Sequence, residues 1–137
     1  MSRYKTIVDG PLVLKAKLDP TETAPALGKG QAVVATKWTV EGSPEPLLVK
    51  TCPDGQIPDF VVGNVAVSAS SPGDILWAGM PGGPALLGGI VSKGDPLVVS
   101  GGKFVKGTKA GDKSPFVAGL NGAANDVIPT APDFSIV

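Results

Sequence analysis

Few side chains in this sequence are of a type that performs chemistry. The 137 residues include no histidine and a single cysteine, Cys52. The commonest general base and zinc ligand is therefore missing, and neither an intramolecular disulfide nor a multi-cysteine metal site is possible. A serine nucleophile would need a lysine as its base, and the pairs Ser92-Lys93 and Lys113-Ser114 are too ordinary to indicate such a dyad. We expect no enzymatic activity, no bound metal and no cofactor.

Carboxylates are the remaining candidates for hydrolytic chemistry or calcium binding. Most of them sit beside glycine or proline, where an aspartate side chain bonds the local backbone of a turn. We therefore expect turn-forming roles for these residues: Asp54, Asp59, Asp74, Asp95, Asp112 and Asp126.

Two glycine-rich segments, 79–83 (GMPGG) and 82–89 (GGPALLGG), superficially resemble phosphate-binding loops. Neither contains the Gly-Lys-Ser/Thr that opens a Walker helix, and no helix is predicted after either segment, as a dinucleotide fingerprint requires. A nucleotide site is not indicated. Cys52, next to Pro53, is interpreted as a small, semi-buried apolar side chain.

Charge and hydropathy exclude further classes. Twelve basic and twelve acidic residues give a net charge of +0. They form no cationic cluster that would neutralise phosphates, so we expect no nucleic-acid partner. No apolar stretch is long enough for a signal peptide or a transmembrane helix. The sequence thus predicts a soluble protein, made in the cytoplasm, with no membrane partner.

The elements that position these residues are predicted to be short strands. Glycine and proline number 19 and 14 and punctuate apolar runs rather than cluster. Strands are expected at 31–42, 46–52, 60–70, 113–120 and 125–131, and a hairpin with a primed turn at Ser100-Gly101-Gly102. Gly-Asp recurs at 73–74, 94–95 and 111–112 ahead of apolar segments and predicts turns, as does Asn121-Gly122. Segment 80–89 is predicted as a connection with at most one helical turn.

This pattern predicts an all-β fold, a small Gly/Pro-rich β-sandwich or barrel with little or no helix. Residues 1–30 look different, because prolines interrupt their scattered apolar residues. We interpret 1–30 as an extended N-terminal arm and 31–137 as a single β-rich domain. The alternative is a first strand, at Lys5–Val8 or Pro11–Leu18, inside the sheet.

The stretch 94–129, GDPLVVSGGKFVKGTKAGDKSPFVAGLNGAANDVIP, resembles the capsid cement, or head-decoration, proteins of tailed bacteriophages. The likeness lies in a Gly-Asp-Pro turn into a strand, a lysine-containing hairpin that ends in Ala-Gly-Asp, and an apolar strand with a Val-x-Gly-x pattern and an Asp-Val close. SSPGDILWAG at 70–79 looks similar to the same family. The resemblance covers residues 60–130, rests on turns and small residues, and does not extend to 1–30 or 42–59.

The resemblance implies a β-tulip-like decoration protein on the outer surface of an icosahedral phage head, synthesised in the host cytoplasm. Such proteins commonly form homotrimers at three-fold or quasi-three-fold positions, where they bridge neighbouring major capsid proteins. An arm that adds a strand to a neighbour, and many copies that each clamp several subunits, would stabilise such a shell.

Two sets of apolar residues are the candidate contacts. For the shell we select residues of the arm: Tyr4, Ile7, Val8, Leu12 and Leu14. For self-association we select residues of segment 80–89: Met80, Pro81, Leu86 and Leu87. Deletion of residues 2–18 is expected to abolish shell binding and leave the domain folded. The alternative is that these side chains cover the domain's own core.

A second hypothesis is a carbohydrate- or ligand-binding β module of a phage fibre or surface adhesin. Its discriminating feature would be an exposed Trp38 or Trp77 that stacks on a sugar, although tryptophan in a β-rich domain more often anchors the core.

Overall fold

The protein is described by a computed structural model over residues 13–37, 47–108 and 116–132, and in these ranges its only regular secondary structure is β-strand. This confirms the predicted all-β class. The strands are β1 (Leu14–Leu18), β2 (Ala26–Leu27), β3 (Ala32–Lys37), β4 (Leu47–Thr51), β5 (Phe60–Val62), β6 (Val67–Ser68), β7 (Gly73–Trp77), β8 (Pro84–Leu86), β9 (Leu97–Ser100), β10 (Lys103–Lys106), β11 (Phe116–Ala118) and β12 (Val127–Pro132).

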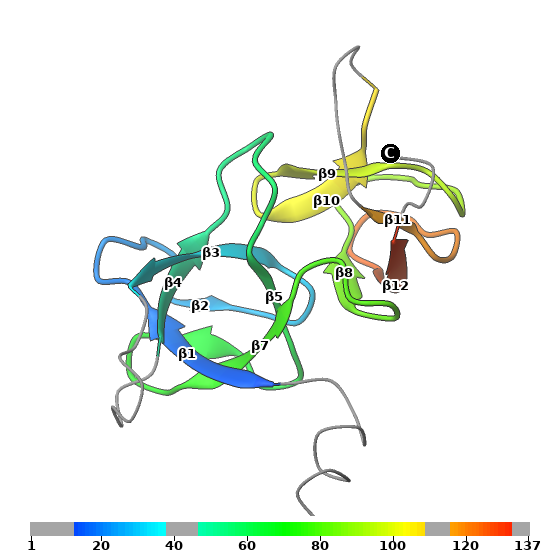
Figure 1. Cartoon of the computed structure of the whole chain (residues 1–137). Helices are drawn as coiled ribbons and strands as arrows, with labels where there is room; N and C mark the ends of the chain where they lie inside the picture. The colour runs from blue at the N-terminus through cyan, green and yellow to red at the C-terminus, as the bar shows by residue number, and fades with distance from the viewer. Residues whose placement is uncertain (1–12, 38–46, 109–115, 133–137) are drawn as a thin grey trace, which may run out of the picture.

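Five strands close into a barrel in the order β1-β4-β3-β5-β7 (Figure 1). β1 closes it by pairing parallel to β4 and antiparallel to β7. Closure removes free strand edges from this half of the molecule. β2 and β6 pair with each other and bury Leu27 and Val67 in the barrel core.

The remaining strands form a second lobe beside the barrel (Figure 1). One sheet has the order β11-β12-β8, and β9 and β10 form a hairpin. Two single bridges, Leu87 with Phe104 and Pro96 with Val117, link these sheets into a ring. Inside it Phe104 and Phe116 pack edge to face, with ring centroids 5.6 Å apart.

The strand period of two explains how the barrel and the second lobe share a wall. In β5, Phe60 and Val62 point into the barrel core, whereas Val61 belongs to a second core shared with the other lobe. In β3, Val33 likewise points into the barrel core and Ala32 into the second core. A strand buried on both faces reads as a continuous apolar run, and this is why FVV carries no polar residue.

The predicted hairpin turn is confirmed. Gly101 and Gly102 have φ values of 62° and 76°, and Ser100 pairs with Lys103. Two successive positive φ values are those of a primed turn, which glycine adopts without steric penalty.

Several local predictions were wrong. Gly73-Asp74 lies inside β7 rather than in a turn. A Cβ atom on Gly73 would stand 2.3 Å from the Ala66 carbonyl oxygen, so glycine is needed here because the two chain segments pass close to each other. The predicted strand 60–70 is split into β5 and β6. Segment 80–89 contains strand β8, which pairs with β12, instead of a helical turn.

Two further predictions need correction. Gly122 of the expected Asn121-Gly122 turn bridges Val91, and the chain turns later, at Asn125 with a φ of 73°. The arm boundary at residue 30 was also wrong, because β1 and β2 fall before it and bury Ala16, Leu18 and Leu27 in the barrel core. The alternative of a first strand within 11–18 is the one that the structure supports.

Candidate functional site

The aspartates of the described residues mostly hold the backbone. Asp95 and Asp126 accept hydrogen bonds from the amides of Ser92 (2.8 Å) and Ala123 (2.9 Å), which confirms their turn roles. Asp54 accepts from the Gly101 amide across the fold at 2.7 Å. Within the described part of the chain no three acidic or sulfur side chains gather as metal ligands. Asp112 lies outside the described residues.

Asp59 and Asp74 are likewise tied to strands. Asp59 accepts from the Ala35 amide at 3.0 Å, and Asp74 forms an ion pair with Lys15. Both aspartates thus connect strands that are paired or adjacent in the barrel sheet.

Two acids fix loop 19–24 to the barrel. Asp19 accepts hydrogen bonds from the Thr21 hydroxyl (2.5 Å) and amide and from the Thr36 hydroxyl (2.6 Å), and these bonds lower its pKa to about 2. Burial alone would raise the pKa of Glu22, but hydrogen bonds from the Thr51 hydroxyl and amide outweigh it and lower the pKa.

Cys52 is a buried thiol, as its apolar interpretation predicts. Only 1% of the residue is exposed, and burial, with Asp59 and Asp54 nearby, raises the pKa of the thiol to about 11. Such a thiol is protonated at neutral pH and is a poor nucleophile.

The residues selected for shell contact fall largely outside the described ranges: Tyr4, Ile7, Val8 and Leu12 all precede residue 13. Leu14 is described, and it is half-buried against the barrel core. Part of this side chain is therefore already used inside the protein.

The residues selected for self-association differ in their exposure to solvent. Pro81 is exposed, and Met80 and Leu86 are half-buried. The selection of Leu87 was wrong, because this residue is 0% exposed and lies in the second core. Side chains along β8 alternate between the two faces of the sheet, so the neighbouring Leu86 points outward. The Met80–Gly83 loop is held in place by Thr130, whose hydroxyl donates to the carbonyls of Met80 (3.3 Å) and Gly83 (3.2 Å).

A feature that sequence reasoning missed is the outer face of sheet β11-β12-β8. Residues that pair directly across antiparallel strands share a face, and the pairs here are Val117 with Ala131, Val127 with Leu86, and Pro129 with Pro84. The intervening Phe116, Ala118 and Ile128 point into the second core. We call the six outward residues the apolar sheet face: Pro84, Leu86, Val117, Val127, Pro129 and Ala131.

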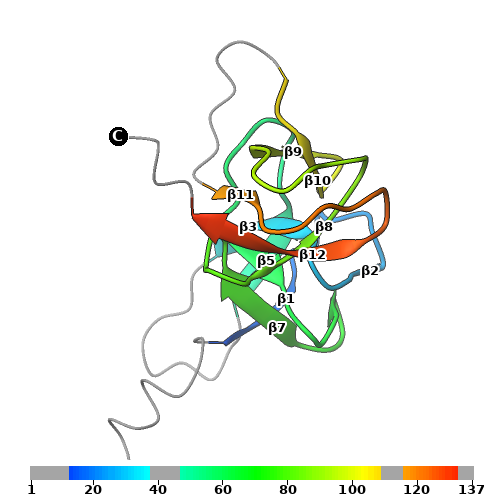
Figure 2. The ribbon, with the colours of Figure 1, turned by 90° about the vertical axis from the view of Figure 1, so that its right-hand side faces the viewer.

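The apolar sheet face carries no polar side chain, although it is accessible: Val127 is 43% exposed and the other five residues are half-buried. In Figure 2, β12 crosses the front of the molecule. A strand with one solvated face normally alternates apolar and polar residues. The sequence signal was thus the run of apolar residues at every second position of VIPTAP, namely Val127, Pro129 and Ala131, on the face that polar residues normally occupy; the polar residue, Thr130, lies on the buried face.

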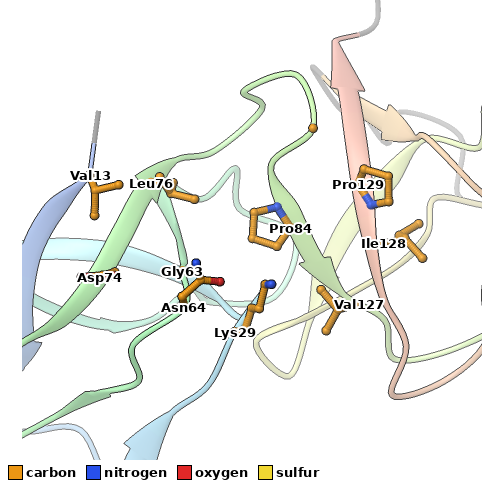
Figure 3. A pocket seen from close by; sticks show the side chains of 11 residues that line it. Val13, Lys29, Gly63, Asn64, Asp74, Leu76, Pro84, Val127, Ile128 and Pro129 are labelled. Carbon is orange, nitrogen blue, oxygen red and sulfur yellow. The ribbon is translucent and has the colours of Figure 1, made fainter. Parts of the chain in front are cut away.

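A cleft of about 360 Å³ separates this sheet from the barrel (Figure 3). Its apolar wall comprises Val13, Leu76, Pro84, Val127, Ile128 and Pro129. Polar groups are contributed by Lys29, Asn64 and Asp74. Volumes of this order suit a few side chains or a small ligand, and junctions between lobes are common binding sites.

Trp77 is 42% exposed and packs on buried Phe60, with ring centroids 4.5 Å apart. It therefore anchors the end of β7 and still shows part of its ring to solvent. Trp38 lies outside the described residues.

No helix in the described ranges is long and apolar enough to span a bilayer. The sequence matches no model of a protein family. It also matches none of the curated proteins.

In three dimensions the chain is similar to the crystal structure of the N base of the head fibre gp8.5 of bacteriophage phi29. The TM-score is 0.67, the sequence identity is 11%, and the superposition covers 90% of this chain and 95% of the other. At this identity the likeness establishes a shared fold. The arrangement of a barrel with an attached β lobe is therefore also that of the base of a phage head fibre.

Proposed function

We propose that this chain is a structural protein of a phage virion that binds the outer surface of the icosahedral head. The observation that carries the proposal is the fold shared with a head-fibre base over nearly the whole of both chains. The resemblance of 94–129 to head-decoration proteins, read independently from the sequence, favours the same setting. The partner is the major capsid protein, and the role requires neither catalysis nor a cofactor.

Residues 1–12 are the proposed contact with the shell, and the apolar sheet face the proposed contact between copies. We propose a homotrimer at three-fold or quasi-three-fold positions that bridges neighbouring capsid proteins. A three-fold contact joins two different patches. Ile90 (81% exposed) and Leu120 (53% exposed), in the segments that the Val91–Gly122 bridge joins, are the candidate second patch.

Cosedimentation of the purified protein with mature, undecorated heads tests this function. We expect saturable binding, weakened by deletion of residues 2–12 and by Leu86→Asp, which places a charge on the apolar sheet face. Lys93→Gln, a change at an exposed side chain outside that face, is the matched control and should bind like the unmodified protein. Failure of the unmodified protein to bind expanded heads would refute the proposal.

A carbohydrate-binding module of a fibre or adhesin is the second candidate, and the partly exposed ring of Trp77 favours it. Aromatic rings stack on the apolar faces of sugars. Saturable quenching of tryptophan fluorescence by a sugar, lost in Trp77→Ala and retained in Trp38→Phe, would support this candidate, whereas a flat titration would remove it.

A further inference from the structure

The apolar wall of the cleft between barrel and second lobe is not covered by any other described part of the chain. Val13 and Val127, on opposite sides of this wall, are 45% and 43% exposed. Leu76 and Pro84 lie between them, and Figure 3 shows their side chains converging on the space. Apolar surface of this kind is stabilised when another apolar segment removes it from water.

The chain itself supplies a segment at this place. Val13 lines the cleft and is the first described residue, so residue 12 is covalently attached to the wall. Residues 4–12 (YKTIVDGPL) contain Tyr4, Ile7, Val8 and Leu12. Fully extended, nine residues reach about 30 Å, and Gly10-Pro11 allows the chain to reverse direction next to the wall.

The segment carries one basic residue, Lys5, and one acidic residue, Asp9, and the acidic one is complementary to a charge on the rim of the cleft. Among the described residues, no ion pair or hydrogen bond involves the Lys29 ammonium group, whereas Asp74 is already paired with Lys15. The rim thus offers one positive charge without a partner inside the described fold. Asp9, four residues before Val13, is the acidic residue of the preceding segment.

We propose that in the free subunit residues 4–12 of the same chain lie in this cleft, with Ile7 and Val8 on the apolar wall and Asp9 beside Lys29. A short tether gives such a segment a millimolar effective concentration at the cleft, which favours the same chain over a second copy. The proposal concerns the free protein and does not depend on binding to a phage head. Pro84, Val127 and Pro129 belong both to the cleft wall and to the apolar sheet face. Residues 4–12 must therefore leave the cleft before copies pair through that face or the head binds these residues.

Cysteine cross-linking of the free protein tests this placement. In Ile7→Cys/Val127→Cys we expect a disulfide within one chain after mild oxidation, identified by mass spectrometry. The control pair, Ile7→Cys/Ile90→Cys, uses the 81% exposed Ile90 outside the cleft and should give about a tenth of that yield. Cys52 is buried with a pKa of about 11 and should not compete.

Equal yields from the two pairs would overturn the proposal. So would a Val127 cross-link that joins two chains, since it would assign the cleft to a second copy. Circular dichroism of each variant confirms that the fold is retained before yields are compared.

The charge pairing gives a second, independent readout. Asp9→Lys should lower the yield of the Ile7–Val127 cross-link about threefold, the scale of an exposed ion pair. Adding Lys29→Asp should restore it. An unchanged yield in Asp9→Lys would contradict the placement of Asp9 beside Lys29.

Discussion

At the scale of single residues, the acidic side chains of the described ranges accept hydrogen bonds that hold loops and strands in place. Asp19 and Glu22 accept hydrogen bonds from threonines of β3 and β4 and so attach loop 19–24 to the barrel. The turn roles predicted from the sequence are confirmed for Asp95 and Asp126, whereas Asp54, Asp59 and Asp74 bond to groups distant along the chain. The sequence by itself assigns no role to Asp19 or Glu22. It does not predict the partners, because Thr36 and Thr51 approach these acids only once the barrel has closed.

The lowered pKa of Asp19 gives a prediction on acid stability. Its pKa is about 2 in the folded protein against an ordinary value of 3.8, so its contribution is complete above pH 3.8 and is lost as the pH falls through 2. Asp19→Asn should therefore destabilise the protein at pH 7 and have little effect near pH 2, measured by urea unfolding. An equal destabilisation at both pH values would contradict this assignment.

Leu86 and Leu87 give a matched pair of neighbouring substitutions. Leu87 is fully buried, so Leu87→Ala should lower the free energy of unfolding by about 2–5 kcal/mol, the range for leucine deletions in packed cores. Leu86 is half-buried on the apolar sheet face, so we expect Leu86→Ala to lose less than about 1 kcal/mol. Urea unfolding measures both. A larger loss for Leu86→Ala would reverse the assigned alternation of β8.

At the scale of elements, strands and turns that depend on local sequence could be predicted, whereas those that depend on contacts with distant parts of the chain could not. The hairpin at Gly101-Gly102 and strands β4 and β12 follow from local sequence, because glycine pairs and branched apolar runs have few alternatives. Gly73-Asp74 was misinterpreted, because this glycine is needed where the Ala66 carbonyl passes, which is a long-range fact. β1 was assigned to an arm because its partners, β4 and β7, lie far along the chain.

The candidate site could likewise be predicted only in part from the sequence. Met80, Pro81 and Leu86 could be selected from an apolar, glycine-rich segment, but nothing local separated Leu86 from buried Leu87. The apolar sheet face joins β11 and β12 to β8, which is distant from them in sequence, so it could not be assembled before the pairing was known.

The corrected position of β1 changes the deletion experiment. Removal of residues 2–18 takes away a barrel strand and buried Ala16 and Leu18, and should abolish cooperative unfolding. Removal of residues 2–12 leaves every described strand in place and should retain a single sharp transition in circular dichroism. A folded 2–18 deletion would show that β1 is dispensable for the barrel.

At the scale of the whole molecule, the two β lobes (Figure 1) share a wall formed by β3, β5 and β7 and leave a cleft on one side (Figure 3). Its described residues include partly exposed apolar side chains and a buried, protonated thiol. Such a chain is suited to assembly, where affinity comes from many weak contacts repeated over a lattice.

The most direct test of the proposed function is cryo-electron microscopy of mature, undecorated heads incubated with the purified protein. We predict added density on the outer surface at three-fold or quasi-three-fold positions, with a contact to more than one major capsid protein. That density should be lost with the deletion of residues 2–12. Heads that remain bare at saturating protein, with the protein folded and the heads expanded, would contradict the account.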